Sequence, residues 1–300
     1  MNRATLLRVQ LRSVAVTAGY LGVLSGLLML SGYLFLGSLG VLLMLAFTFA
    51  TLLASGRLPV NVVMRMRGAR PLHADEAYPL LAMVTRLARA LGLQNPPQLY
   101  LVPARELQAF ALKSGGQTAI GLSPNLVREL SPDELEGVLA HELSHLANGD
   151  TRVMAAAAAM RGLTRSLASL AWVLLLVSMV IPSALSVSLG AMILLLAAPT
   201  LSYLAELGLS RTREFNADLA AVQLTGRPES LAQALLKLEQ HQSGLLQRLV
   251  GRAVVLRIPE ALRTHPSTAE RVRRLLAFDQ RPPASPQPPT RSTRWSVTMV

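Results

Sequence analysis

Two long stretches without any charged residue dominate this sequence. Residues 13–56 and 166–205 contain no Asp, Glu, Lys, Arg or His. A bilayer core about 30 Å thick needs roughly 20 apolar residues per helix, so each stretch is long enough for two membrane-spanning helices. A backbone in lipid must satisfy its own hydrogen bonds, which favours helices over open strands. We therefore expect four transmembrane helices, arranged as two hairpins.

Small residues and a proline mark the expected tips of these hairpins. Ser31, Gly32, Gly37, Ser38 and Gly40 interrupt the Leu-rich first stretch. In the second stretch, Pro182 and Ser183 do the same. Glycine and proline favour turns over continued helix, so each stretch should reverse direction near these positions.

Arginines at the outer ends of both stretches predict the orientation. They cluster before and after each hairpin, and the tips contain none: Arg3, Arg8, Arg12, Arg57, Arg65, Arg67, Arg70, Arg152, Arg161, Arg165, Arg211 and Arg213. Cytoplasmic loops carry the excess of Lys and Arg, so both hairpins should enter and leave on the cytoplasmic side. This predicts a multi-pass protein of the cell membrane with both termini and its soluble parts in the cytoplasm.

The composition narrows the possible partners. Hydrophobic residues make up 51% of the chain and charged residues 15%, with a formal net charge of +12. Because the basic residues flank the expected spans and no aromatic-basic motif accompanies them, we expect contact with anionic lipids and not with nucleic acid. The chain has no cysteine, which excludes disulfides, thiolate metal ligands and a cysteine nucleophile.

Removing the hairpins leaves two soluble pieces that should fold together. We expect an N-terminal segment with the first hairpin, a first soluble piece, the second hairpin, a second soluble piece and a disordered Pro-rich tail: residues 1–56, 57–165, 166–205, 206–280 and 281–300. The first soluble piece opens with a helical pattern over residues 78–91. The runs PQLYLV, LQAFALK and QTAIGLS then read as short strands, the last two joined by a turn at Ser114, Gly115 and Gly116. These patterns predict an α+β domain with a small sheet.

A strong helix start precedes the segment HELSH. In SPDELEGVLAHELSHLANGD, Ser131 is followed by proline and, three residues on, by Glu134, which is the pattern of a capping box. Apolar residues then recur at helical spacing, at Leu135, Val138, Leu139 and Leu146, before the stop signal Asn148-Gly149. HELSH therefore lies on a helix.

The spacing within HELSH suits metal-dependent hydrolysis. His141 and His145 are four residues apart, so they project from one helix face and could bind one zinc ion. Glu142 lies about 100° around the helix from His141, near the metal but outside its ligand set. It could take a proton from water and later deliver it to the leaving amine. A catalytic zinc site needs three protein ligands and one open position.

The third ligand is not in the helix itself. Thr151 stands where the pattern HExxHxxGxxH would place a histidine. In SRTREFNADLAAVQL, just beyond the second hairpin, Glu214 and Asp218 are four residues apart on a helical pattern. Glu214 is the best candidate ligand, and Asp218 could hydrogen-bond the outer nitrogen of a histidine ligand. Asp150 is a weaker candidate ligand because it follows the helix stop so closely.

HELSHLANGD and, after a hairpin, REFNAD resemble the membrane-bound zinc metalloproteases of the M48 family, in particular the HtpX-like branch of bacterial heat-shock proteases. The resemblance implies a zincin-like (gluzincin) fold and a zinc metalloendopeptidase with one Zn²⁺ per chain. It assigns His141, His145 and Glu214 as zinc ligands, Glu142 as catalytic base and Asp218 as the acid behind a ligand. The late segment THPSTAERVRRL also matches, so His265 and Arg271 are expected to contact the substrate or transition state.

The resemblance also implies a function and a mode of substrate binding. The substrates would be unfolded or misfolded membrane and cytoplasmic proteins, cleaved in a stress response with membrane quality-control partners. In zincin-type proteases the substrate adds as a strand beside the sheet edge, which we place at residues 117–122.

Two alternatives stay open from the sequence. One is a prenyl-protein endopeptidase of the same superfamily. The other is a catalytically silent membrane scaffold or chaperone adaptor with a structural zinc.

Overall fold

The computed structural model describes residues 3–54, 59–73, 77–114, 116–180, 189–250 and 267–279. The chain forms two compact units. The helical unit contains Met1–Ser55 and Arg152–Arg213, and the mixed unit contains Gly56–Thr151 and Glu214–Val300. Helices α6 (Asp150–Val180) and α7 (Leu189–Thr225) contribute residues to both units.

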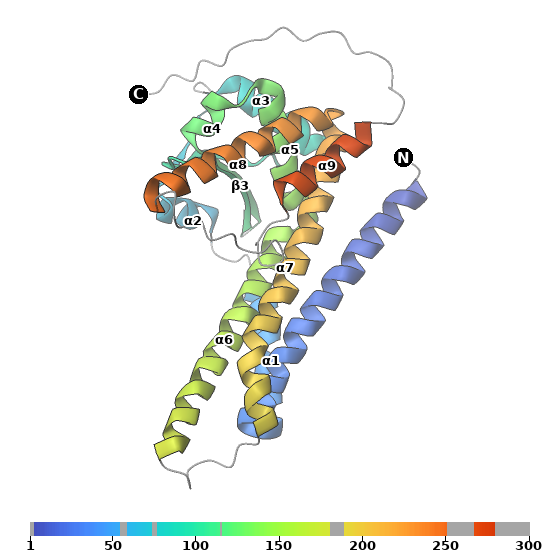
Figure 1. Ribbon diagram of the computed structural model, residues 1–300. Coiled ribbons are helices and arrows are strands. Elements are labelled where there is room, and N and C mark those ends of the chain that lie inside the picture. Colours follow the sequence, from blue (N-terminus) through green and yellow to red (C-terminus); the bar gives the residue numbers. More distant parts are fainter. Residues whose placement is uncertain are drawn as a thin grey trace. The chain divides into compact units, whose positions relative to one another are not determined.

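The helical unit begins with α1 (Arg3–Ala54), whose helical path is broken at Gly37 (Figure 1). Gly37 has φ 60° and ψ −141°, a backbone conformation that residues with a Cβ avoid. The chain folds back on itself there and brings Gly40 against Gly32. The two backbones are so close that a Cβ atom on Gly40 would overlap the carbonyl of Gly32. The prediction that small residues break this stretch is confirmed. The predicted turn at Pro182 and Ser183 lies outside the described residues.

The interior of the helical unit is small and its surface is apolar. Its buried cluster draws on α1, α6 and α7: Leu24, Leu28, Ala157, Met160, Ala205 and Leu209. Much of α1 remains exposed instead, with Leu36, Leu39, Leu42 and Phe49 between 55% and 64% exposed. Such a continuous apolar surface needs a partner or a lipid environment.

Two helices in the described part of the chain are long and apolar enough to cross a membrane. They are Val14–Ala54, with mean hydropathy 2.2, and Ile193–Thr225, with mean hydropathy 1.5. The predicted number of four spans is therefore not shown, and it stays a prediction.

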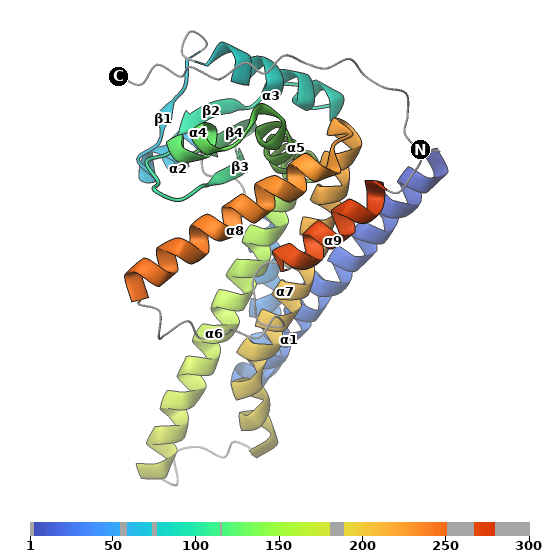
Figure 2. The same cartoon turned by 45° about the horizontal axis from the view of Figure 1, so that its top comes forward.

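The mixed unit combines a four-stranded sheet with helices (Figure 2). The strands are β1 (Arg70–Pro71), β2 (Gln98–Leu101), β3 (Ala109–Ser114) and β4 (Gln117–Leu122). The helices before α6 are α2 (Val60–Met66), α3 (Tyr78–Ala90), α4 (Pro124–Glu129) and α5 (Pro132–Asn148), and the later ones are α8 (Pro228–Val250) and α9 (Thr268–Asp279). The predicted α+β class, the three predicted strands and the helix near residues 78–91 are confirmed.

The sheet order corrects one prediction. The order is β1-β2-β4-β3, so β4 lies inside the sheet, parallel to β2 and antiparallel to β3. The expected edge at residues 117–122 is therefore wrong. The edge strands of this sheet are β3 and the two-residue strand β1. Burial explains the order, because β4 buries Ala119, Ile120, Gly121 and Leu122 in succession, as a strand covered on both faces does. The residues of β3 are mostly half-buried.

Helix α5 begins and ends as its sequence predicts. Ser131 accepts a hydrogen bond from the Glu134 backbone N–H, and the Glu134 carboxylate accepts one from the Ser131 N–H, which completes the capping box. Lys237 of α8 forms an ion pair with the buried Glu134 at 2.7 Å. At the other end Gly149 adopts the left-handed conformation with φ 69°, so the helix stops there.

Helix α5 lies at the centre of the core of the mixed unit. Its buried leucines include Leu135, Leu139, Leu143 and Leu146, and burying each contributes about 1.5–3 kcal/mol. On a different part of its surface, Gly137 packs so closely on α8 that an added Cβ would lie 3.3 Å from the Leu231 Cα. These contacts fix α5 between the sheet and α8, and they thereby fix the position of HELSH.

Candidate metal centre

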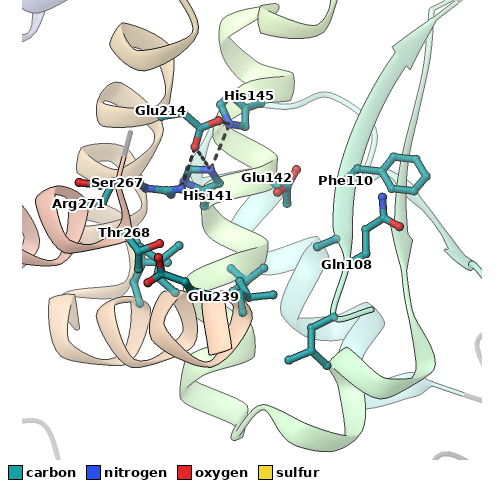
Figure 3. Close-up of a pocket in the computed structure, with 16 residues that line it drawn as sticks. Gln108, Phe110, His141, Glu142, His145, Glu214, Glu239, Ser267, Thr268 and Arg271 are labelled. Carbon is teal, nitrogen blue, oxygen red and sulfur yellow. Dashed lines mark hydrogen bonds and ion pairs between the residues drawn. The ribbon is translucent and has the colours of Figure 1, made fainter. Parts of the chain in front are cut away.

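His141 and His145 lie on adjacent turns of α5, with their Nε2 atoms 3.2 Å apart. Glu214 of α7 faces both rings (Figure 3), with Oε2 3.4 Å from His141 Nε2 and Oε1 3.9 Å from His145 Nε2. A tetrahedral zinc ion with ligands at about 2.0–2.2 Å would place its ligand atoms roughly 3.3–3.6 Å apart. Among the described residues, these three side chains form the group that could hold a metal ion.

A carboxylate and a guanidinium stand behind His141. Its Nδ1 lies 3.0 Å from Asp218 Oδ1, and Asp218 is four residues beyond Glu214 in α7. Arg271 of α9 donates to Asp218 from Nε at 2.8 Å and from Nη2 at 2.6 Å. The Nη1 atom of Arg271 lies 3.0 Å from Glu214 Oε2. Arg271 thus pairs with both of the buried carboxylates that face His141.

His145 also has a carboxylate behind it. Its Nδ1 lies 2.7 Å from Asp150 Oδ2, and Asp150 is 4% exposed. Asp150 thus contacts the nitrogen of His145 that faces away from His141 and Glu214. No sequence pattern predicts this contact, because it depends on the direction in which the chain turns at Gly149.

The two histidines have opposite pKa shifts. Burial lowers the pKa of His141, but the hydrogen bonds to Asp218 and Glu214 raise it, and the net pKa is about 9. Burial and the charge on His141 together lower the pKa of His145 to about 4. At neutral pH His141 is therefore a charged imidazolium and His145 is a neutral imidazole. A metal ion would have to displace the extra proton of His141.

Glu142 follows His141 in α5 and faces the cleft instead of the ligand group (Figure 3). Burial raises the pKa of its carboxyl, although the charges of His141 and His145 oppose the shift. The carboxylate also accepts a hydrogen bond from the backbone N–H of Ala111 in β3. A carboxyl whose pKa is raised towards neutrality can both accept and donate a proton in catalysis.

The cleft beside these residues has a volume of about 620 Å³. One wall comes from the segment that leads into the edge strand β3 and from β3 itself, including Gln108 and Phe110. The opposite wall comes from α8 and α9, with Leu235, Glu239 and Thr268 among its residues. A free strand edge along a cleft can pair with an extended peptide.

Of the other histidines, the two that the structure describes, His73 and His241, do not join this centre. His265 lies outside the described residues, so its expected contact stays a prediction. His241 Nε2 lies 3.2 Å from the carbonyl oxygen of Arg105, and its Nδ1 lies 3.8 Å from Glu129. His73 is exposed. Arg271, in contrast, lines the cleft.

Comparison with known proteins identifies the family. The model of peptidase family M48 matches residues 75–279, and this range contains every residue of the candidate centre. The chain belongs to peptidase family M48. Among its M48 relatives, the protease HtpX homolog of Acaryochloris marina is 36% identical over 276 residues, covering 88% of this chain and 94% of that protein. The homolog of Aquifex aeolicus is 32% identical and covers 84% and 88%.

A solved structure supports the fold of this M48 protein. The crystal structure of S. mikatae Ste24p is similar with a TM-score of 0.52 and 20% sequence identity. The match covers 90% of this chain but 66% of that chain, just under two thirds of its length. At this identity the likeness concerns the fold alone. Family membership and the HtpX homologs together indicate a membrane metalloprotease.

Proposed function

We propose that this protein is a zinc-dependent endopeptidase in which His141, His145 and Glu214 hold one zinc ion and Glu142 is the general base. The observation that carries the proposal is the spacing of the three ligand atoms, all within 4.8 Å of one another, with Glu142 next to them on the cleft side. A structural zinc site usually has four protein ligands, whereas a catalytic site has three and an open position. The three-residue set favours catalysis.

The ligand types also fit zinc. Two imidazole nitrogens and one carboxylate oxygen form a ligand set found in zinc peptidases. Zinc in such a site acts as a Lewis acid that polarises the scissile carbonyl and makes water a better nucleophile. Asp218 holds the ring of His141 from behind, and Arg271 keeps Asp218 and Glu214 in place.

Glu142 moves the proton in this proposal. Its carboxylate takes a proton from the attacking water and then delivers it to the nitrogen of the leaving amine. Its raised pKa makes the carboxylate a stronger base than an ordinary one, so it takes the proton of the water more readily. The hydrogen bond from the Ala111 N–H orients the carboxylate beside the edge strand, where the peptide bond would lie.

The edge strand β3 supports a substrate in extended form. Main-chain hydrogen bonds to a strand edge depend little on side chains, so many sequences can bind. A peptide must be locally unfolded before it can pair in this way. We therefore infer that the substrates are unfolded or misfolded membrane and cytoplasmic proteins, which corresponds to proteolytic quality control.

The membrane arrangement is part of the proposal. The charge-free stretches predict four spans, and the arginines that flank them favour a cytoplasmic location for both termini and the soluble parts. The exposed leucines of α1 support lipid contact.

The test is cleavage of an unfolded protein such as casein by the full-length protein in detergent. Glu142→Gln should lower the rate by about 10²–10⁴-fold, the usual contribution of a general base. The matched control is Glu136→Gln, which changes a carboxylate on the same helix that pairs with Arg86. It should cleave like the wild type, and a zinc chelator should stop cleavage. Equal rates for Glu142→Gln and the wild type would contradict the proposal.

A further inference from the structure

The imidazole of His145 has different partners on its two nitrogens. Its Nε2 faces the candidate metal position, 3.2 Å from His141 Nε2 and 3.9 Å from Glu214 Oε1. Its Nδ1 faces the other way and lies 2.7 Å from Asp150 Oδ2. Asp150 therefore contacts His145 across the ring from the metal position.

The chain brings Asp150 there by a tight turn. Helix α5 ends at Asn148, and Gly149 takes the left-handed conformation with φ 69°. Asp150 then begins α6, in a first turn where a carboxylate interacts favourably with the helix dipole. Its side chain is 5% exposed. Burying a carboxylate costs free energy unless the carboxylate is paired, and the contact with His145 offsets part of this cost.

We infer that Asp150 is a positioning residue for His145: its carboxylate accepts the Nδ1 proton, so the Nε2 lone pair stays directed at the metal. The inference rests on the proposed zinc peptidase function. It gives His145 the same support that Asp218 gives His141, at 3.0 Å from Nδ1. A hydrogen-bonded carboxylate fixes the tautomer and ring orientation of a ligating histidine and raises its basicity.

Two other roles for Asp150 make different predictions. If Asp150 were a metal ligand, one of its carboxylate oxygens would lie near the Nε2 atoms of His141 and His145. Its Oδ2 instead contacts Nδ1 of His145, on the other side of the ring. As a residue that only starts α6 it would affect folding stability and leave the affinity for zinc unchanged. Zinc affinity therefore separates positioning from helix capping.

The experiment measures the zinc dissociation constant of full-length protein in detergent, by competition with a chromogenic chelator. Asp150→Ala removes the acceptor and should weaken zinc binding about 10–100-fold, as is typical when a group behind a metal ligand is lost. Asp150→Asn keeps an acceptor oxygen without the charge and should lose less. The ordering from wild type through Asn to Ala is the expected result.

Asp133→Asn is the matched control. Asp133 is also a carboxylate in the first turn of a helix, but it is half exposed and pairs with Arg227. The zinc affinity of the Asp133→Asn protein should equal that of the wild type. If Asp150→Ala does not fold, Asp150→Asn, which has nearly the same shape, decides the question.

A second readout follows the proton directly. In zinc-loaded wild type, selective ¹⁵N labelling of histidine should show His145 protonated at Nδ1 with a strong hydrogen bond, and Asp150→Ala should lose that signature. Unchanged zinc affinity and an unchanged Nδ1 signal in both Asp150 variants would overturn the inference and leave the proposed function standing. A wild type that binds no zinc would overturn both.

Discussion

Arg271 donates to both carboxylate oxygens of Asp218, from Nε at 2.8 Å and from Nη2 at 2.6 Å. The same guanidinium contacts Glu214 Oε2 at 3.0 Å, and Asp218 contacts the Nδ1 of His141 at 3.0 Å. Only a planar guanidinium can make these parallel contacts with one carboxylate and still reach a second. Arg271 of α9 therefore stabilises the positions of Glu214, a candidate metal ligand, and of Asp218, which contacts the candidate ligand His141.

Removing Arg271 should destabilise the mixed unit. In Arg271→Met the carboxylates of Asp218 and Glu214 lose their buried partner, which should lower the free energy of unfolding by about 3–5 kcal/mol. Arg271→Lys should recover part of this, because one ammonium cannot pair with both carboxylates in the same geometry. Denaturant or thermal unfolding of zinc-stripped protein in detergent measures the loss.

The control for Arg271 is on the same helix. Arg274 forms an exposed pair with Glu270 at 2.7 Å and lies over the Phe215 ring. Arg274→Met should cost less than about 1 kcal/mol, as is usual for exposed pairs. Equal losses for Arg271→Met and Arg274→Met would show that the buried network contributes no special stability.

Zinc binding should release a proton from His141. Because the pKa of His141 is raised to about 9, the zinc-stripped protein is protonated there at pH 7. Zinc must displace this proton, so zinc affinity should rise about tenfold per pH unit from pH 7 and level off above about pH 9. His145, with its pKa lowered to about 4, should contribute no further dependence in this range. Titration calorimetry in buffers of different ionisation enthalpy counts the protons, and a pH-independent affinity would contradict the assignment.

The packing of α5 on α8 should not tolerate a large side chain at Gly137. A Cβ added at Gly137 would lie 3.3 Å from the Leu231 Cα, and backbone atoms cannot move aside easily. Gly137→Leu should therefore cost about 1–3 kcal/mol in stability and reduce cleavage, because Leu231 also lines the cleft. Gly137→Ala should change stability by less than about 1 kcal/mol, since its tighter contact is offset by the higher helix propensity of alanine. Thermal unfolding compares the two, and equal melting temperatures would contradict the packing argument.

Pairing with β3 should depend on the amide hydrogens of the substrate. N-methylation of one peptide bond near the cleavage site removes one donor, and a net hydrogen bond contributes about 0.5–1.5 kcal/mol. For at least one position near the cleavage site, KM should rise about two- to tenfold while methylation further away has no effect. A series of peptides methylated at successive positions tests this. Uniform KM values across the series would exclude strand pairing as the binding mode.

Much of the local structure was predictable, because local signals determine it. The Ser131 cap, the stop at Gly149 and the periodic leucines between them predict α5, and four-residue spacing places His141 and His145 on one face. The order of the sheet was not predictable in this way. Two neighbouring strands joined by a short turn look alike in sequence, and only the pairing of β4 with β2 makes β3 the edge.

Contacts between segments that are distant in the sequence were only partly predictable. Glu214 and Asp218 could be proposed because they share a helical repeat near the second charge-free stretch. The contact of Asp150 with His145 could not be derived, because the direction of the chain after a left-handed glycine depends on the packing that follows. The number of membrane spans also stays a prediction. Length and hydropathy show that two helices in the described residues could cross a membrane, but they do not show how many times the chain crosses it.

The most direct test of the proposed division of roles is the zinc content of three purified proteins equilibrated at the same free zinc concentration. Wild type and Glu142→Gln should each hold about one zinc ion per chain, because Glu142 is outside the ligand set. Glu214→Gln should hold much less, because it lacks the third ligand. Full zinc in Glu214→Gln together with loss of zinc in Glu142→Gln would contradict the assignment of both residues.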